Sequence, residues 1–259
     1  MPRFAANLSM LYPQHDFVSR FAAAARDGFR AVEYLFPYAH DARLLARQLA
    51  DHGLQQVLFN APPGDFDGGE RGIAALPGRE AEFRGAVAQA LDYAHTLACP
   101  RVHIMAGLAP AGAERAALRA TYLANLAWAA GQAASAGVKL LIEPINRFDI
   151  PGFYLNTTAQ ALSILDEVGA ANAYVQYDIY HAQRMEGELA ATIARHLPRI
   201  AHIQLADNPG RHEPGSGEIH YPWLLRHIDG LGYAGWIGCE YKPAGLTRAG
   251  LGWLAQFTE

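Results

Sequence analysis

The chain alternates short β-type runs with longer helical runs from end to end, and this alternation constrains its fold more than any other feature. The expected strands are Phe4–Asn7, Ala31–Phe36, Gln56–Asn60, Arg101–Met105, Lys139–Glu143, Ala173–Asp178, Ile200–Asp207 and Gly235–Glu240. The expected helices are Asp16–Asp27, Asp41–His52, Arg79–Leu97, Ala113–Ala136, Thr158–Val168, Gly187–His196, Tyr221–Leu231 and Leu246–Phe257. Such alternation predicts parallel strands joined by helical crossovers. Eight units in one run favour a closed (β/α)₈ TIM barrel over an open doubly wound sheet.

The length of the chain fits one such barrel. It has 259 residues, and a barrel of this kind takes about 250. We find no linker or low-complexity segment and expect a single barrel domain over residues 1–259. A Gly/Pro/Asp-rich segment at residues 61–78 is long for a plain connection, which indicates a functional or mobile loop.

Composition excludes several classes of partner. The net charge is −4 with a pI near 6.2, so the basic surface of a nucleic-acid-binding protein is not expected. There is no apolar run of membrane-spanning length and no signal peptide. Cys99 and Cys239 are expected to be buried free thiols, as is usual in a reducing cytoplasm. We therefore predict a cytoplasmic enzyme with a small-molecule substrate, and homo-oligomerisation stays open.

Four oxygen-bearing side chains stand at or near the ends of consecutive expected strands: Glu143, Asp178, Gln204 and Glu240. In a TIM barrel the carboxyl ends of the strands meet at one mouth, where active sites lie. A structural alternative is that loop amides satisfy each of these side chains. That alternative explains any one of them more readily than all four. The pattern therefore predicts a common site.

Strand alternation predicts what lies beneath this site. Side chains two residues apart share a face, so the layer below is expected to be Leu141, Gln176, His202 and Gly238. Gln176 and His202 are then placed to orient the quartet by hydrogen bonds. Glu33 and His103 also fall on inward positions, where supporting or core roles are expected.

The quartet also predicts a metal. Three carboxylates at one mouth stay ionised together only if positive charge lies among them. Carboxylate and amide oxygens suit a hard divalent cation, Mg²⁺ or Mn²⁺. Zn²⁺ would usually recruit imidazole or thiolate.

Six stretches of the chain carry a family resemblance: RFAANLSMLY, GERGIAALPGRE, IEPINRFDIPGFYLNT, YDIYHAQRMEGEL, HIQLADNPGRHEPGSGEI and GWIGCEYKP. Together they resemble hydroxypyruvate isomerases of the xylose-isomerase-like TIM-barrel superfamily. The resemblance runs from Arg3 to about Trp253. It implies an intramolecular oxidoreductase of glyoxylate metabolism that interconverts hydroxypyruvate and tartronate semialdehyde (2-hydroxy-3-oxopropanoate).

The resemblance also implies roles for individual residues. It implies a metal bound by the quartet, with catalysis by Glu143 and Glu240. His181, three residues after the metal-binding aspartate, and Arg211, in RHEPGSG, are implied substrate-binding residues. Many superfamily members have histidine where this chain has Gln204, and His220 stands where close relatives are expected to have asparagine.

The implied reaction removes a proton from the hydroxyl-bearing carbon and returns one to its neighbour, through an enediolate. One glutamate would remove the proton and the other return it, and the sequence does not say which. Arg211 would pair with the substrate carboxylate, and Lys242 is a second candidate for that anion.

Three alternatives remain. A 2-oxo-tetronate isomerase or a related sugar-acid isomerase or epimerase would use the same residues on a longer substrate. A metal nuclease of the endonuclease IV type would need a histidine-rich zinc cluster and a basic surface. A sugar-acid binder without turnover would not require both glutamates.

Overall fold

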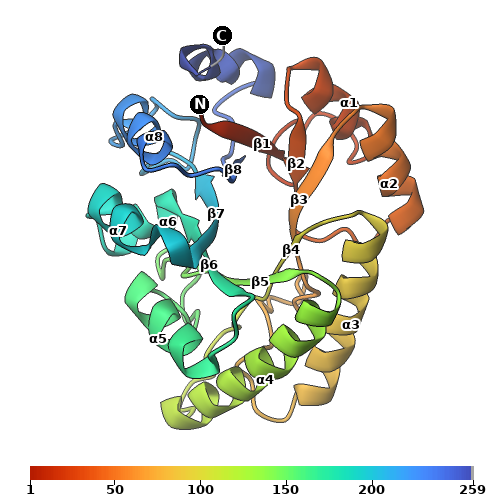
Figure 1. Cartoon of the computed structure of the whole chain (residues 1–259), viewed down its shortest axis with the longest axis vertical. Helices are drawn as coiled ribbons and strands as arrows, with labels where there is room; N and C mark the ends of the chain where they lie inside the picture. The colour runs from red at the N-terminus through yellow and green to blue at the C-terminus, as the bar shows by residue number, and fades with distance from the viewer. Residues whose placement is uncertain (258–259) are drawn as a thin grey trace.

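The computed structural model describes residues 1–257, which form a closed barrel of eight parallel strands in sequence order (Figure 1). The strands are β1 Arg3–Asn7, β2 Ala31–Glu33, β3 Gln55–Asn60, β4 Arg101–His103, β5 Lys139–Ile142, β6 Ala173–Asp178, β7 Ile200–Leu205 and β8 Trp236–Cys239. Pairing of β1 with β8 closes the ring. The predicted TIM barrel is confirmed.

Helices surround the strands and cover the outside of the barrel (Figure 1). They are α1 Ser19–Arg26, α2 Ala42–Asp51, α3 Glu80–Thr96, α4 Arg115–Ser135, α5 Thr158–Val168, α6 Ile179–Met185, α7 Leu189–His196 and α8 Tyr221–Gly230, with 3₁₀ segments η1 Leu197–Arg199 and η2 Thr247–Gln256. The main hydrophobic core lies between the outward faces of the strands and these helices. Because side chains alternate along a strand, every second strand residue packs in this core and the residues between them point into the barrel interior.

The element boundaries differ from prediction mainly at the mouth of the barrel. β2 and β4 stop at Glu33 and His103, because the chain turns into loops there. The last predicted helix is a 3₁₀ segment. The helix α6 was not predicted, and it begins immediately after Asp178, the last residue of β6.

Polar side chains fill the barrel interior below the mouth. The buried Glu33 carboxylate accepts hydrogen bonds from Asn7 Nδ2 (3.0 Å) and Gln204 Nε2 (2.7 Å), and His202 Nε2 lies 2.5 Å from its other oxygen. These residues come from β1, β2 and β7, so the network links strands that are not all neighbours. Because a buried carboxylate is costly to leave unpaired, these bonds hold the interior in one arrangement.

The opposite end of the barrel is closed by an arginine. Arg101, at the start of β4, donates from Nε to the Ala201 carbonyl at 2.9 Å, and Nη1 lies 3.4 Å from the Val57 carbonyl. Since β4 and β7 are not adjacent strands, this side chain crosses the interior. Arg101 therefore blocks this end of the barrel interior, opposite the mouth.

Gly238 is required by the Glu33 network. A Cβ at Gly238 would overlap the Glu33 carboxylate, so we expect Gly238→Ala to lower the free energy of unfolding by about 2–3 kcal/mol. Urea denaturation would measure this loss. Gly230→Ala is the matched control, because nothing lies within 4 Å of a Cβ at Gly230. Equal stability of Gly238→Ala and the wild type would contradict this account of the barrel interior.

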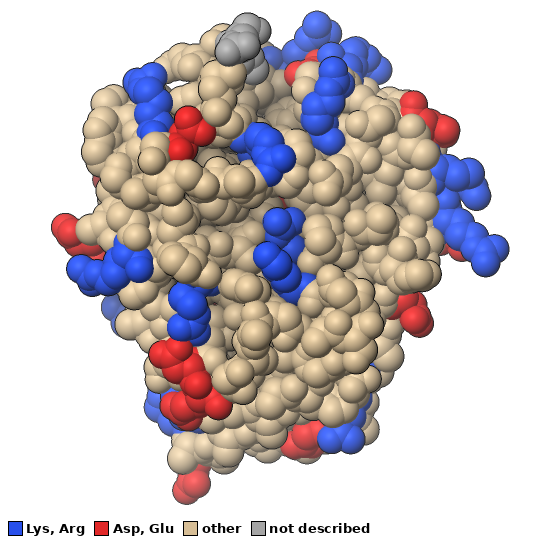
Figure 2. Space-filling view, viewed as in Figure 1, with Lys and Arg blue, Asp and Glu red and all other residues tan. Residues whose placement is uncertain are grey.

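On the face seen in Figure 2, acidic and basic side chains are interspersed around the perimeter, and a few basic side chains lie at the centre. Among residues 1–257, no helix has the length and apolar character needed to cross a membrane. Cys99 and Cys239 are buried free thiols, as predicted.

Candidate active site

The four predicted strand-end residues all lie buried at the mouth of the barrel. Glu143 and Glu240 follow β5 and β8 directly, Asp178 ends β6, and Gln204 lies in β7 beside Asp178 in the strand register. Parallel pairing of β5 through β8 brings them to one end, as the strand pattern predicted.

Asp178 is the last residue of β6 and caps the start of α6. Its Oδ1 accepts hydrogen bonds from the backbone N–H groups of Tyr180 (2.7 Å) and His181 (3.3 Å), which caps the helix. Its Oδ2 is buried and has no hydrogen-bond partner within residues 1–257. One oxygen therefore fixes the side chain, and the other is available to a ligand.

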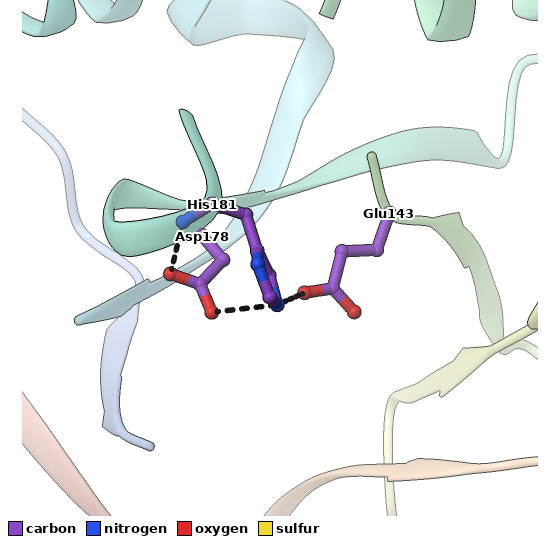
Figure 3. A group of neighbouring side chains, drawn as sticks. All are labelled: Glu143, Asp178 and His181. Carbon is purple, nitrogen blue, oxygen red and sulfur yellow. Dashed lines mark hydrogen bonds and ion pairs between the residues drawn. The ribbon is translucent and has the colours of Figure 1, made fainter. Parts of the chain in front are cut away.

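The short helix α6 directs the His181 side chain into the site. The imidazole is buried, and its Nε2 lies 3.7 Å from Asp178 Oδ2 and 3.8 Å from Glu143 Oε1. Figure 3 shows the ring edge between the two carboxylates. These three side chains are close enough together to hold a metal ion. His181 was predicted to bind substrate and was not among the four predicted metal ligands, which all offer oxygen.

Hydrogen bonds around Asn146 define the proton position on His181. Asn146 Oδ1 accepts from the backbone N–H groups of Phe148 (3.0 Å) and Asp149 (2.8 Å), which orients the amide. Its Nδ2 therefore donates to His181 Nδ1 at 2.6 Å. Because Nδ1 is the acceptor, the proton of the neutral ring lies on Nε2. Burial, with a smaller effect of Arg211, lowers the pKa of His181 well below its usual value, so the ring is neutral.

This tautomer changes how the cluster can act. With a proton on Nε2, His181 presents a hydrogen-bond donor to the space between the two carboxylates, and its lone pair is used at Nδ1. The ring is thus better suited to donate to a substrate oxygen than to ligate a cation.

Glu143 has one supported oxygen and one free one. Its Oε2 accepts from Gln176 Nε2 at 3.0 Å and lies 3.7 Å from His103 Nδ1. Its Oε1 is buried and has no hydrogen-bond partner in the described chain. Burial, followed by repulsion from Glu240 and Asp178, raises the pKa of Glu143 well above its usual value.

Glu240 lies on the other side of the mouth. Its Oε2 accepts from Arg211 Nη2 at 2.8 Å, and Asn7 Nδ2 lies 3.3 Å from its Oε1. Burial raises the pKa of Glu240 to about 8, partly opposed by Arg211. Both glutamates therefore hold protons more readily than exposed carboxylates do, as proton-transferring groups at neutral pH often do.

Gln204 is held by the interior network. Its Nε2 donates to Glu33, and its Oε1 accepts from Gln176 Nε2 at 2.6 Å. Gln176 also donates to Glu143, so the predicted orienting role of Gln176 agrees with these contacts. The Gln204 oxygen is already hydrogen-bonded and supports the site from below.

Arg211 lies among the carboxylates. Its Nη2 contacts Glu240 and lies 3.9 Å from Asp178 Oδ2, and its Nη1 lies 3.8 Å from Asp149 Oδ2. Its backbone has a φ of 55°, in a loop held by hydrogen bonds from four backbone N–H groups to Asp207. Its charge is therefore already balanced by acids of the protein.

Lys242 does not reach the site. Its side chain is exposed and does not line the cavity, while its backbone N–H donates to the Arg211 carbonyl at 2.7 Å. The geometry gives the proposed anion-binding role of Lys242 no support.

A cavity of about 140 Å³ at the mouth is lined by Glu143, His181, Arg211 and Glu240, whereas Asp178 and Gln204 are not among its lining residues. This volume is small beside the roughly 300–1,000 Å³ of pockets for drug-sized ligands, and it suits a small substrate. The lining includes Met10, Leu35, Phe36, Asn60, Phe66, Arg71, His103, Met105, Glu143, Ile145, Ile150, His181, Arg211 and Glu240. Arg71 was not predicted, although the unusual length of its loop indicated a function for that segment.

The donors fit a hard divalent cation. Glu143 Oε1 and Asp178 Oδ2 are both buried without hydrogen-bond partners in residues 1–257, and both belong to carboxyl groups whose pKa is raised by burial. A cation between such oxygens would offset their desolvation and mutual repulsion.

Comparisons with known proteins agree with this architecture. The sequence model of the xylose isomerase-like TIM barrel matches residues 21–257. A 2-oxo-tetronate isomerase from Cupriavidus necator is 58% identical, covering 99% of both chains. A hydroxypyruvate isomerase from Escherichia coli is 51% identical, covering 98% of both chains.

Solved structures show the same fold. A crystal structure from Brucella melitensis, described as an AP endonuclease of family 2, superposes with a TM-score of 0.98 at 45% identity and covers 100% of both chains. The family resemblance seen in the sequence is thereby confirmed: the chain belongs to the xylose isomerase-like TIM barrel family.

Proposed function

We propose that this protein is an isomerase that interconverts hydroxypyruvate and tartronate semialdehyde by proton transfer between adjacent carbons. The observation that carries the proposal is that two buried glutamates, from the non-adjacent strand ends of β5 and β8, line one small cavity. Two such groups can address different carbons of a substrate held between them.

In the proposed reaction, one glutamate removes a proton from the hydroxyl-bearing carbon of hydroxypyruvate, giving an enediolate. The other delivers a proton to the former carbonyl carbon, and a proton moves between the two substrate oxygens to complete the aldehyde. The raised pKa values of Glu143 and Glu240 suit groups that both accept and release protons near neutral pH.

His181 and Arg211 would support the charge that develops on the substrate. The Nε2–H of His181 would donate to a substrate oxygen beside Glu143. Arg211, held by Glu240, would keep that carboxylate oriented and add positive potential to the cavity. Both contributions act where negative charge grows in the enediolate.

We propose that Glu143, Asp178, Glu240 and the oxygen of Gln204 hold the cation, which is Mg²⁺ or Mn²⁺. Such a cation would supply Lewis-acid stabilisation of negative charge on the substrate oxygens. In this chain, Gln204 must exchange its contact with Gln176 to contribute, which makes it the weakest of the proposed ligands.

A four-carbon 2-oxo acid is the second candidate substrate. The relative from Cupriavidus necator, at 58% identity, is a 2-oxo-tetronate isomerase, and the hydroxypyruvate isomerase from Escherichia coli stands at 51%. The same residues would serve both reactions, so rates on three- and four-carbon substrates decide between them.

Nuclease activity is a weaker candidate despite the description of the Brucella relative. The cluster contains one histidine among buried carboxylates, whereas a zinc nuclease of this superfamily is expected to have a histidine-rich cluster. The small cavity and the net charge of −4 also favour a small acid over DNA.

Proton NMR in D₂O with hydroxypyruvate, run with and without a chelator, tests the proposal. We expect tartronate semialdehyde to form with deuterium at the newly protonated carbon, and the chelator to stop the reaction. A protein that leaves hydroxypyruvate unchanged in the presence of Mg²⁺ and of Mn²⁺ would rule the activity out and favour a sugar-acid binder.

Cation binding should also be visible without turnover. We expect millimolar Mg²⁺ or Mn²⁺ to raise the melting temperature by about 5 °C, measured by scanning calorimetry. The shift should grow from pH 6 to pH 8, because protons compete for carboxyl groups such as Glu240, whose pKa is raised to about 8. Asp178→Asn should remove the shift, and its full retention in that variant would place the cation elsewhere.

A further inference from the structure

The loop between β3 and α3, residues 61–78, is held against the segment that follows β4 by a close backbone contact. Gly72 forms an isolated antiparallel bridge with Ala106 and has a φ of 104°. A Cβ at Gly72 would overlap the Met105 carbonyl, so only glycine permits this approach. The preceding residue, Arg71, is therefore presented to the cavity from a fixed backbone.

The Arg71 side chain is also held in one orientation. Its Nη1 donates to the carbonyls of Phe66 (2.9 Å) and Glu70 (2.6 Å), and its guanidinium carbon lies 4.0 Å from the centroid of the Phe66 ring. Phe66 in turn packs on Phe36, with ring centroids 5.0 Å apart. Within residues 1–257, Arg71 Nε and Nη2 have no hydrogen-bond partner, so two donors remain for a ligand.

Arg71 differs from the other arginine of the cavity in its charge balance. No carboxylate of the described chain lies within 4.0 Å of the Arg71 guanidinium, whereas Arg211 contacts Glu240 and lies within 4.0 Å of Asp149 and Asp178. At one end of the cavity, carboxylates of the protein balance the charge of Arg211. At a second position, the charge of Arg71 has no such carboxylate among the described residues.

We propose that Arg71 binds the carboxylate of the substrate, an inference that rests on the function proposed above. A guanidinium binds a carboxylate strongly through parallel N–H donors, and half-burial beside Phe66 reduces screening by water. With its carboxylate at Arg71, a small hydroxy-carbonyl acid would extend its reacting carbons toward Glu143 and Glu240. Arg71 thus takes the carboxylate-binding role that was predicted from the sequence for Arg211.

The test compares an anionic substrate with a neutral counterpart of the same length. Dihydroxyacetone has a hydroxymethyl group where hydroxypyruvate has a carboxylate. We expect Arg71→Met to lower kcat/KM for hydroxypyruvate roughly 10- to 50-fold and to change kcat/KM for dihydroxyacetone by less than about threefold. Arg71→Lys should give an intermediate loss, because it keeps the charge without the planar pair of donors.

Arg79→Met is the matched control for a displaced loop. Arg79 follows this loop at the start of α3, forms ion pairs with Glu70 of the loop and Glu82 of the helix, and does not line the cavity. If loss of loop packing explains the Arg71 phenotype, Arg79→Met will reproduce it. We expect this control to retain the wild-type preference for the anion.

Calorimetric titration with pyruvate supplies a readout that is independent of turnover. We expect Arg71→Met to bind pyruvate at least tenfold more weakly than the wild type, with Arg79→Met unchanged. Equal losses on both substrates, or unchanged pyruvate binding in Arg71→Met, would overturn the inference. If the wild type turns over neither substrate, the proposed function fails, and the titration still decides whether Arg71 binds carboxylates.

Discussion

Replacing either Glu143 or Glu240 with glutamine is expected to lower turnover of hydroxypyruvate by about 10³-fold or more. Glutamine preserves the shape of the side chain and removes its ability to accept a proton. Each glutamate lies in the cavity with little solvent exposure, so water is poorly placed to replace it. Steady-state rates, with circular dichroism to confirm the fold, would measure the effect.

Deuterium exchange would further separate the two roles. A variant that keeps the base and lacks the second glutamate should still exchange the hydroxyl-bearing carbon of hydroxypyruvate with D₂O while forming no product. The reciprocal variant should neither exchange nor form product. Near-normal turnover by either variant would remove that glutamate from the mechanism.

Asn146→Asp is expected to lower kcat by about 10²- to 10³-fold, through the proton on His181. An aspartate in this position would accept a hydrogen bond from His181 Nδ1, so the proton would leave Nε2. The donor between Glu143 and Asp178 would then become an acceptor beside two carboxylates. The change leaves the size of the side chain nearly constant.

Nitrogen NMR of the imidazole gives a direct readout of this effect. We expect the wild-type ring to be protonated at Nε2 and the Asn146→Asp ring at Nδ1. Asn156→Asp is the control, because Asn156 donates to the Ile145 carbonyl nearby and makes no hydrogen bond to His181. An unchanged tautomer in Asn146→Asp, or an equal loss of activity in Asn156→Asp, would show that Asn146 does not position the proton.

The barrel and the placement of its acids could be predicted because both depend on regular periodicities. Alternating strand and helix patterns define the eight units, and side chains at the strand ends must meet when parallel strands close. The order of the strands was therefore enough to predict that Glu143, Asp178 and Glu240 lie together. The ends of the strands were less predictable, because β2 and β4 stop where contacts with loops replace the hydrogen bonds between neighbouring strands.

The contacts of His181, Asn146 and Arg71 could not be predicted because they depend on irregular turns and loops, which have no sequence period. The buried position of His181 depends on α6, a helix too short to show a clear period, which starts at the Asp178 cap. The orientation of Asn146 depends on two backbone N–H groups of its own turn. Arg71 reaches the cavity only because Gly72 allows its loop to touch the segment after β4.

The site draws its acids from the barrel strands and Arg71 from a loop, and this has a consequence for how its substrate specificity can change in evolution. The acids stand at the ends of barrel strands that the Glu33 hydrogen-bond network connects, so a substitution in that network alters both folding and catalysis. Arg71 and Phe66 stand on a connecting segment whose replacement leaves that scaffold intact. A shift in substrate length should therefore arise first in residues 61–78, and grafting that segment between relatives is a direct route to new specificity.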